Sequence, residues 1–213
     1  MSRFKIRNLS EDLSKYTGKG VKIGVIDTWL SPIVRAKYKI NYKDFIGCRT
    51  DHPHGTYIVN IIFKNAPNVE MYYCRVFNYD KARIERINSA LKYLLIKDLD
   101  ILNCSFGTKL YNYEFEKLLR LHVNNNTLVF APMCGHEYLW PHSIRGIISV
   151  GALYRDNNAD LYCNDVFRVY EYVNKDFLLS GRSMACAYAA SIGCLMREKY
   201  LGISRKGFLD KIS

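Results

Sequence analysis

The sequence lacks the segments that would direct a chain to a membrane or divide it into modules. Residues 1–7 are basic but contain no continuous apolar stretch of the kind found in signal peptides, and no apolar run approaches the length of a membrane span. No repeat, low-complexity tract or linker rich in proline, glycine and serine interrupts the 213 residues, of which 49% are hydrophobic. We therefore expect one soluble, cytoplasmic domain over residues 1–213, with no membrane partner.

Paired cysteine spacings are missing as well. The seven cysteines form no disulfide or zinc-finger pattern, which indicates reduced thiols that pack as small core side chains. A zinc site built from Cys48, His52 and His54 is a weaker alternative, because no second pair of ligands follows at a suitable spacing. We expect neither a metal ion nor another cofactor to take part in the function.

Acidic residues are few relative to basic ones. The chain has 31 lysines and arginines against 20 aspartates and glutamates, a formal net charge of +11, with loose concentrations at residues 3–22 and 197–211. No aromatic-basic recognition motif accompanies this charge, so nucleic acid is not an expected partner. A solvated basic face is the simplest interpretation, and attraction of an acidic peptide is the functional alternative.

The hydrophobic pattern predicts alternating strands and helices. A short apolar run over residues 21–26 ends at Asp27, as a buried parallel strand does at its carboxyl end, where ligands bind in open parallel sheets. Further strands are expected at residues 69–76, 101–105, 128–131 and 147–150, and apolar stripes with helical spacing at residues 82–97 and 113–123. This alternation predicts an α/β fold with a mostly parallel central sheet and helices on both faces.

Two further patterns bear on the secondary structure, one of them in the last third of the chain. Aromatic and β-branched residues alternate within residues 159–179, which predicts a hairpin before the final helix. Helix formers or small residues follow His54 and Ser183, over residues 56–63 and 184–200. Both side chains should therefore stand at helix N-termini, where backbone N–H groups are free.

Three short motifs supply a carboxylate, an imidazole and a hydroxyl in that order. They contain Asp27 in residues 25–28 (VIDT), His54 in residues 54–56 (HGT) and Ser183 in residues 181–185 (GRSMA). Nucleophilic acyl transfer needs these three groups, because serine attacks, histidine takes its proton and aspartate orients the histidine. The chain order Asp, His, Ser is informative, since convergent triads differ in their order.

Together with residues 17–21, 101–107 and 140–152, these motifs resemble the subtilisin-like serine peptidases, or subtilases. The resemblance implies a three-layer subtilisin-like fold and a serine endopeptidase that hydrolyses a peptide or protein substrate. It implies Asp27, His54 and Ser183 as the catalytic residues. His54 is preferred to His52 because the glycine and threonine of the family motif follow it. Calcium is frequent in that family, but no acidic ligand loop is recognisable, so a structural calcium site is not assigned.

The resemblance also suggests residues around the triad. Ser105, Phe106 and Gly107 are similar to the segment that pairs with the extended substrate backbone, and Gly135 is expected beside it. Subtilases usually read Gly-Asn-Glu where this chain has residues 135–137 (GHE), and the asparagine amide donates to the oxyanion. Neutral imidazole still has one N–H donor, so His136 and the Ser183 N–H are expected to form the oxyanion hole.

The chain departs from the family at Arg182, where a small hydroxyl residue is usual, and in a shortened loop at residues 137–140. The Asp27 motif begins so near Met1 that we expect no folding pro-segment. The small size and basic charge favour a dedicated processing protease that removes a leader from a peptide precursor. The alternative is a catalytically impaired subtilase-fold module, a pseudoprotease that binds peptide in the same cleft.

Overall fold

The computed structural model describes residues 4–6, 12–48, 51–79, 81–133, 140–154, 166–171 and 181–212. One eight-stranded sheet runs through them in the order β1-β8-β7-β6-β5-β2-β4-β3. Every neighbouring pair from β8 to β3 is parallel, and β1 joins the edge antiparallel to β8. The predicted α/β fold with a mostly parallel sheet is therefore confirmed.

The elements have the following bounds. The strands are β1 (Phe4–Ile6), β2 (Lys22–Asp27), β3 (Asn41–Asp44), β4 (Glu70–Arg75), β5 (Ile101–Asn103), β6 (Leu128–Pro132), β7 (Ile148–Tyr154) and β8 (Val166–Glu171). The helices are α1 (Pro32–Lys37), α2 (His54–Asn65), α3 (Ile84–Leu95), α4 (Tyr113–Asn124), α5 (Arg182–Lys199) and α6 (Arg205–Asp210).

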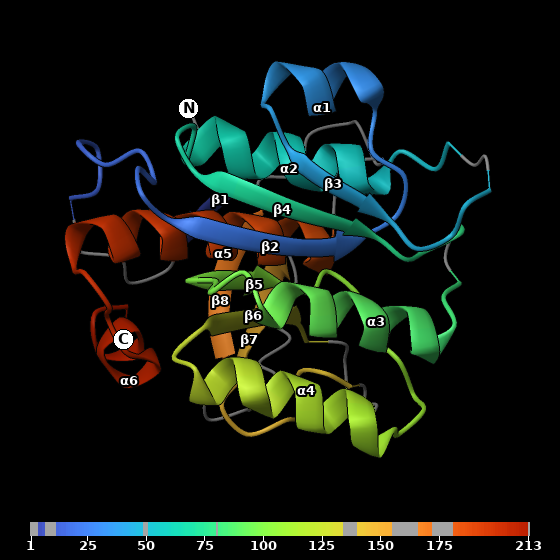
Figure 1. Cartoon of the computed structure of the whole chain (residues 1–213). Coiled ribbons are helices and arrows are strands. Elements are labelled where there is room, and N and C mark those ends of the chain that lie inside the picture. Colours follow the sequence, from blue (N-terminus) through green and yellow to red (C-terminus); the bar gives the residue numbers. More distant parts are fainter. Residues whose placement is uncertain are drawn as a thin grey trace.

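Helices cover both faces of the sheet, which gives three layers (Figure 1). α2 and α5 pack on one face and α3 and α4 on the other. Strand β2 contributes side chains to both faces of the sheet. Val25 belongs to the core under α2 and α5, and its neighbour Ile26 belongs to the core under α3 and α4. Successive strand residues point to opposite faces, so a strand covered on both sides reads as a continuous apolar run.

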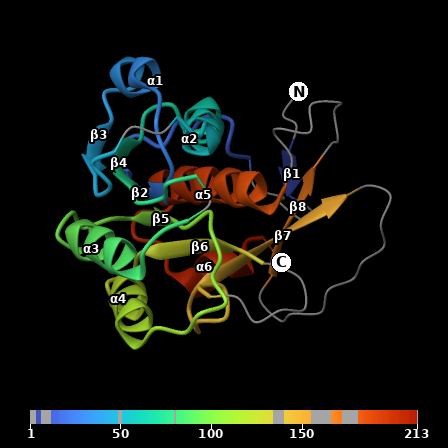
Figure 2. The same cartoon turned by 90° about the vertical axis from the view of Figure 1, so that its right-hand side faces the viewer.

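α5 is the most deeply buried helix of the described chain and crosses the middle of the sheet (Figure 2). Small side chains let it approach the strands closely: a Cβ on Gly193 would lie 2.9 Å from the Phe130 ring. The helix begins after Gly181, whose φ of 118° favours glycine. The close packing of α5 thus determines where its first residues, including Ser183, are placed.

The segment predicted to form a hairpin, residues 159–179, contains strand β8. The described part of residues 159–179 is β8, which pairs antiparallel with the distant β1 and parallel with β7, the strand before it, whereas a hairpin needs antiparallel neighbours. Alternating apolar residues indicate a strand but do not identify its partner, and the rest of this segment lies outside the described residues.

No helix within the described ranges is long and apolar enough to cross a membrane.

Candidate active site

Asp27 and His54 form a hydrogen-bonded pair at the carboxyl end of the parallel strands. Asp27 is the last residue of β2 and only 3% exposed, and His54 is the first residue of α2. His54 Nδ1 lies 2.7 Å from Asp27 Oδ1, which also accepts the N–H of Thr28 at 2.7 Å. A carboxylate only accepts hydrogen bonds, so Nδ1 carries the proton and Nε2 of the neutral ring is left as a proton acceptor.

The environment of His54 favours its charged form. Burial by itself lowers the pKa of the ring, but the charge of Asp27 and the hydrogen bond to it outweigh burial, so the pKa of His54 is raised above its ordinary value. A histidine with a raised pKa is a stronger base once it is deprotonated. This is the property that a general base for a serine hydroxyl requires.

The residues next to the pair explain the local sequence. A Cβ on Gly55 would overlap the hydroxyl of Tyr73 and lie 3.0 Å from the Trp29 carbonyl oxygen, so only glycine fits there. The Gly55 N–H donates to Thr28 Oγ1 at 2.9 Å, and the Tyr73 hydroxyl donates to the Thr28 carbonyl at 2.8 Å. Thr28 and Tyr73 therefore hold the start of α2 against the end of β2, and sequence reasoning gave neither of them this role.

Thr28 also fixes the position of His52. Its hydroxyl donates to the His52 carbonyl at 3.0 Å, which leaves His52 in the loop before α2, as predicted, while His54 reaches Asp27. Among the described residues, no group of three or more histidine, cysteine, aspartate or glutamate side chains could hold a metal ion. Cys48, His52 and His54 are all described, and they do not form such a group.

Ser183 is the second residue of α5 and faces the loop after β5. Its hydroxyl donates to the Ser105 carbonyl at 3.0 Å, and the Ser105 hydroxyl donates to the Ser183 carbonyl at 3.0 Å. Within the described ranges no hydrogen bond joins Ser183 to His54. The Ser183 N–H is one of the first-turn donors for which an α-helix offers no internal acceptor. A negatively charged oxygen beside it would be stabilised by this N–H and by the helix dipole.

A pocket of about 250 Å³ opens beside the pair. It is lined by Asp27, Thr28, His52, His54, Phe77, Tyr79, Ser105, Phe106 and Gly107. Three of the four residues predicted to bind peptide, Ser105, Phe106 and Gly107, thus share one pocket with the predicted base, and Ser105 links them to Ser183. A second hollow of about 510 Å³ continues past Phe106 and Gly107 to apolar side chains that include Ile84, Ile87 and Leu110.

Gly135, a predicted substrate contact, and His136, a predicted oxyanion-hole donor, lie outside the described residues, so both roles stay predictions. Arg182, the departure next to Ser183, is half-buried and lies near His142. Burial, and then the positive charge of Arg182, lower the pKa of His142. Arg182 is the first residue of α5, so its positive charge lies in the first turn of that helix.

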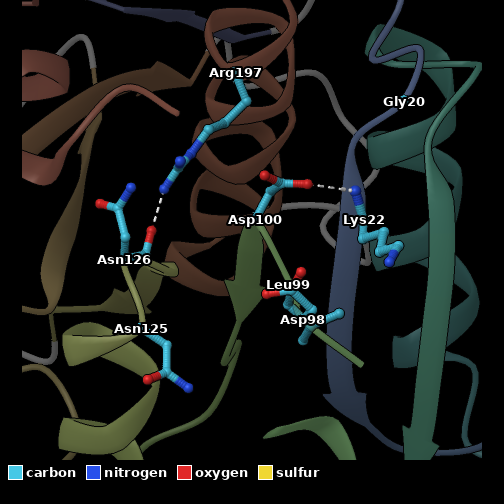
Figure 3. A pocket seen from close by; sticks show the side chains of 8 residues that line it. All are labelled: Gly20, Lys22, Asp98, Leu99, Asp100, Asn125, Asn126 and Arg197. Atoms are coloured by element: carbon cyan, nitrogen blue, oxygen red, sulfur yellow. Dashed lines mark hydrogen bonds between the residues drawn. The ribbon is translucent and has the colours of Figure 1, made fainter. Parts of the chain in front are cut away.

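A hollow at the opposite end of the sheet is of a different kind (Figure 3). It measures about 320 Å³ and lies where β2 begins, so it is separated from the pair of Asp27 and His54 by the length of that strand. The guanidinium of Arg197 donates to the Asn126 carbonyl, and Asp100 Oδ2 accepts the Lys22 N–H at 2.9 Å. These contacts tie α5, the end of α4 and the sheet together, which is a structural role.

No protein-family model and no curated protein sequence matches the chain. Solved structures match its fold. The prenylagaramide maturation protease PagA has a TM-score of 0.70 at 18% sequence identity, over 88% of this chain and 79% of that chain. The self-cleaved protease domain of PatA gives 0.67 at 15% over 86% and 82%, and a lanthipeptide protease gives 0.69 at 15% over 92% and 80%. The chain therefore has the subtilisin-like fold that its motifs predicted.

Proposed function

We propose that this chain is a serine endopeptidase in which Ser183 is the nucleophile, His54 the general base and Asp27 the residue that orients His54. The observation that carries the proposal is the 2.7 Å hydrogen bond between His54 and buried Asp27, in a pocket shared with Ser105, which is hydrogen-bonded to Ser183. The subtilisin-like fold supports it, because the structures of similar fold are described as proteases.

The proposed reaction needs one rotation before chemistry begins. The Ser183 hydroxyl turns from the Ser105 carbonyl to His54 Nε2, which takes its proton as Oγ attacks the peptide carbonyl carbon. The Ser183 N–H and the His136 side chain stabilise the oxyanion. His54 then gives the proton to the leaving amine as the C–N bond breaks, and water hydrolyses the acyl ester to regenerate Ser183.

We propose an extended peptide as the substrate. It lies along residues 105–107, and the apolar hollow beyond Phe106 accepts one of its side chains. PagA and PatA are described as maturation proteases, which supports leader removal from a peptide precursor as the biological task. The net charge of +11 favours acidic segments in that precursor.

Labelling with a fluorophosphonate probe tests the proposal. The wild-type chain should form one adduct at Ser183, located by mass spectrometry of its peptides, and Ser183→Ala should form none. His54→Ala should label much more slowly, because no other group takes the serine proton. Labelling at a different residue, or equal labelling of His54→Ala and wild type, would contradict the assignment.

A peptide-binding module without catalysis is the second candidate. The observation that favours it is the position of the Ser183 hydroxyl, which is hydrogen-bonded to Ser105 and not to His54. In that case the folded chain would bind a peptide but would not react with the probe. Labelling and peptide binding measured on the same sample therefore separate the two functions.

A further inference from the structure

Three hydrogen bonds connect a buried asparagine to Ser183. Asn103 ends β5 and is fully buried, and its Nδ2 donates to Ser105 Oγ at 2.9 Å. Because Ser105 Oγ accepts this bond, its own proton is directed to the Ser183 carbonyl, 3.0 Å away. The Ser105 carbonyl in turn accepts from the Ser183 hydroxyl at 3.0 Å. Ser105 therefore holds Ser183 at its backbone and at its side chain.

Asn103 is costly for the fold. Its Oδ1 is buried and has no hydrogen-bond partner within the described part of the chain, although Ile101 and Leu102 before it are wholly apolar core residues. A leucine of similar shape would leave no polar atom unsatisfied. The amide is therefore better explained by what its Nδ2 donates to than by core packing.

We propose that Asn103 and Ser105 are positioning residues for the Ser183 nucleophile, an inference that rests on the peptidase function proposed above. The Ser105 hydroxyl, oriented by Asn103, holds the Ser183 backbone at the first turn of α5. The Ser183 hydroxyl then moves from the Ser105 carbonyl to His54 by rotation about one side-chain bond, while its Cα stays in place. Neither Asn103 nor Ser105 forms a hydrogen bond with His54, so they control the rate of attack and not the protonation of the base.

The test is the rate constant for fluorophosphonate labelling, measured across pH. Ser105→Ala should label about tenfold to a hundredfold more slowly than wild type, because a misplaced nucleophile attacks less often. Ser105→Thr, which keeps a hydroxyl, should recover most of the rate. Asn103→Leu should also slow labelling without lowering the thermal midpoint, since it removes the unsatisfied oxygen together with the donor. In all three variants the pH at half-maximal rate should stay that of wild type.

Ser191→Ala is the matched control, because it also removes a buried serine hydroxyl, one in α5 that is bonded to the Tyr188 carbonyl of the same helix. If wild type labels at Ser183 while Ser105→Ala and Asn103→Leu label at the wild-type rate, the inference is wrong and the peptidase function stands. A shifted pH midpoint would also overturn it. A wild-type chain that does not label overturns both. If Ser105→Ala fails to fold, the labelling rate of Asn103→Leu alone decides whether the inference holds.

Discussion

The protonation of His54 links activity to pH. Its pKa is raised above the ordinary value of 6.5, so we expect the labelling rate to rise with pH and to reach half its maximum above pH 6.5. Stability changes with pH in the opposite direction. Because the pKa of His54 is higher in the folded than in the unfolded chain, His54 stabilises the fold at a pH below its unfolded-state pKa, and this contribution is lost as the pH rises through the folded-state pKa. A pH series of labelling rates and urea midpoints measures both effects.

Asp27→Asn should separate the carboxylate from the rest of the site. Without the charge of Asp27 the pKa of His54 should fall, because burial, which lowers it, remains. The labelling rate at neutral pH should nevertheless drop by about 10⁴-fold, since an amide no longer holds the productive tautomer. Asp12→Asn, which removes an exposed carboxylate bonded to Ser14, should change neither value. An unchanged rate in Asp27→Asn would refute the role of this residue.

Gly55 supports a prediction about folding. Gly55→Ala should destabilise the chain by about 1–3 kcal/mol, because its Cβ would overlap the Tyr73 hydroxyl. In a Tyr73→Phe background the same substitution should cost less, since the overlapping oxygen is gone. Urea unfolding of the four proteins measures this coupling. Equal costs in both backgrounds would contradict it.

At the residue scale, the sequence was sufficient to propose the triad but not its supports. Asp27, His54 and Ser183 stand in recognisable motifs, and the structure brings the first two into contact. Tyr73 and Asn103 could not be predicted as supports. The pairing of β4 with β2 brings Tyr73 to Thr28, and Asn103 is linked to Ser183 only through Ser105, which meets α5 in the folded chain. Whether His136 replaces the family asparagine stays a prediction.

At the scale of elements, the close contact between α5 and the sheet should control the site at a distance. Gly193→Val should destabilise the chain by about 1–3 kcal/mol and slow labelling of Ser183, because a larger side chain meets Phe130 and Ile101 and moves the helix. Gly207→Ala in α6 is the control, since its nearest neighbour there is the Ile203 side chain, 3.2 Å away. That variant should be neutral or slightly stabilising.

The buried elements were predictable and the exposed ones were not. Apolar stripes predicted α3 and α4, and continuous apolar runs predicted five of the parallel strands. β3 and α1 escaped detection because β3 has mostly exposed residues and α1 has no buried residue. The position of β1 beside β8 depends on pairing between segments far apart in the sequence, for which local sequence carries no signal.

At the scale of the whole molecule, the charge should act on association. With a net charge of +11, acidic peptides should be cleaved faster than neutral ones of equal length at low salt, and the difference should shrink as salt screens the field. Initial cleavage rates of both peptides, measured at low substrate concentration and at two salt concentrations, test this difference. Equal rates for both peptides at low salt would show that the charge does not steer the substrate.

Under the proposed peptidase function, the burial of α5 has a further consequence. A protease at high concentration is exposed to its own activity, and a segment must leave its fold and become extended before it can enter a cleft of this type. α5 carries 14 buried residues, with Ser183 at its start and Arg197 anchored at its other end. Opening this helix requires most of the molecule to unfold. Self-digestion should therefore first cut chain segments outside α5, and the helix that carries Ser183 should be among the last to be lost.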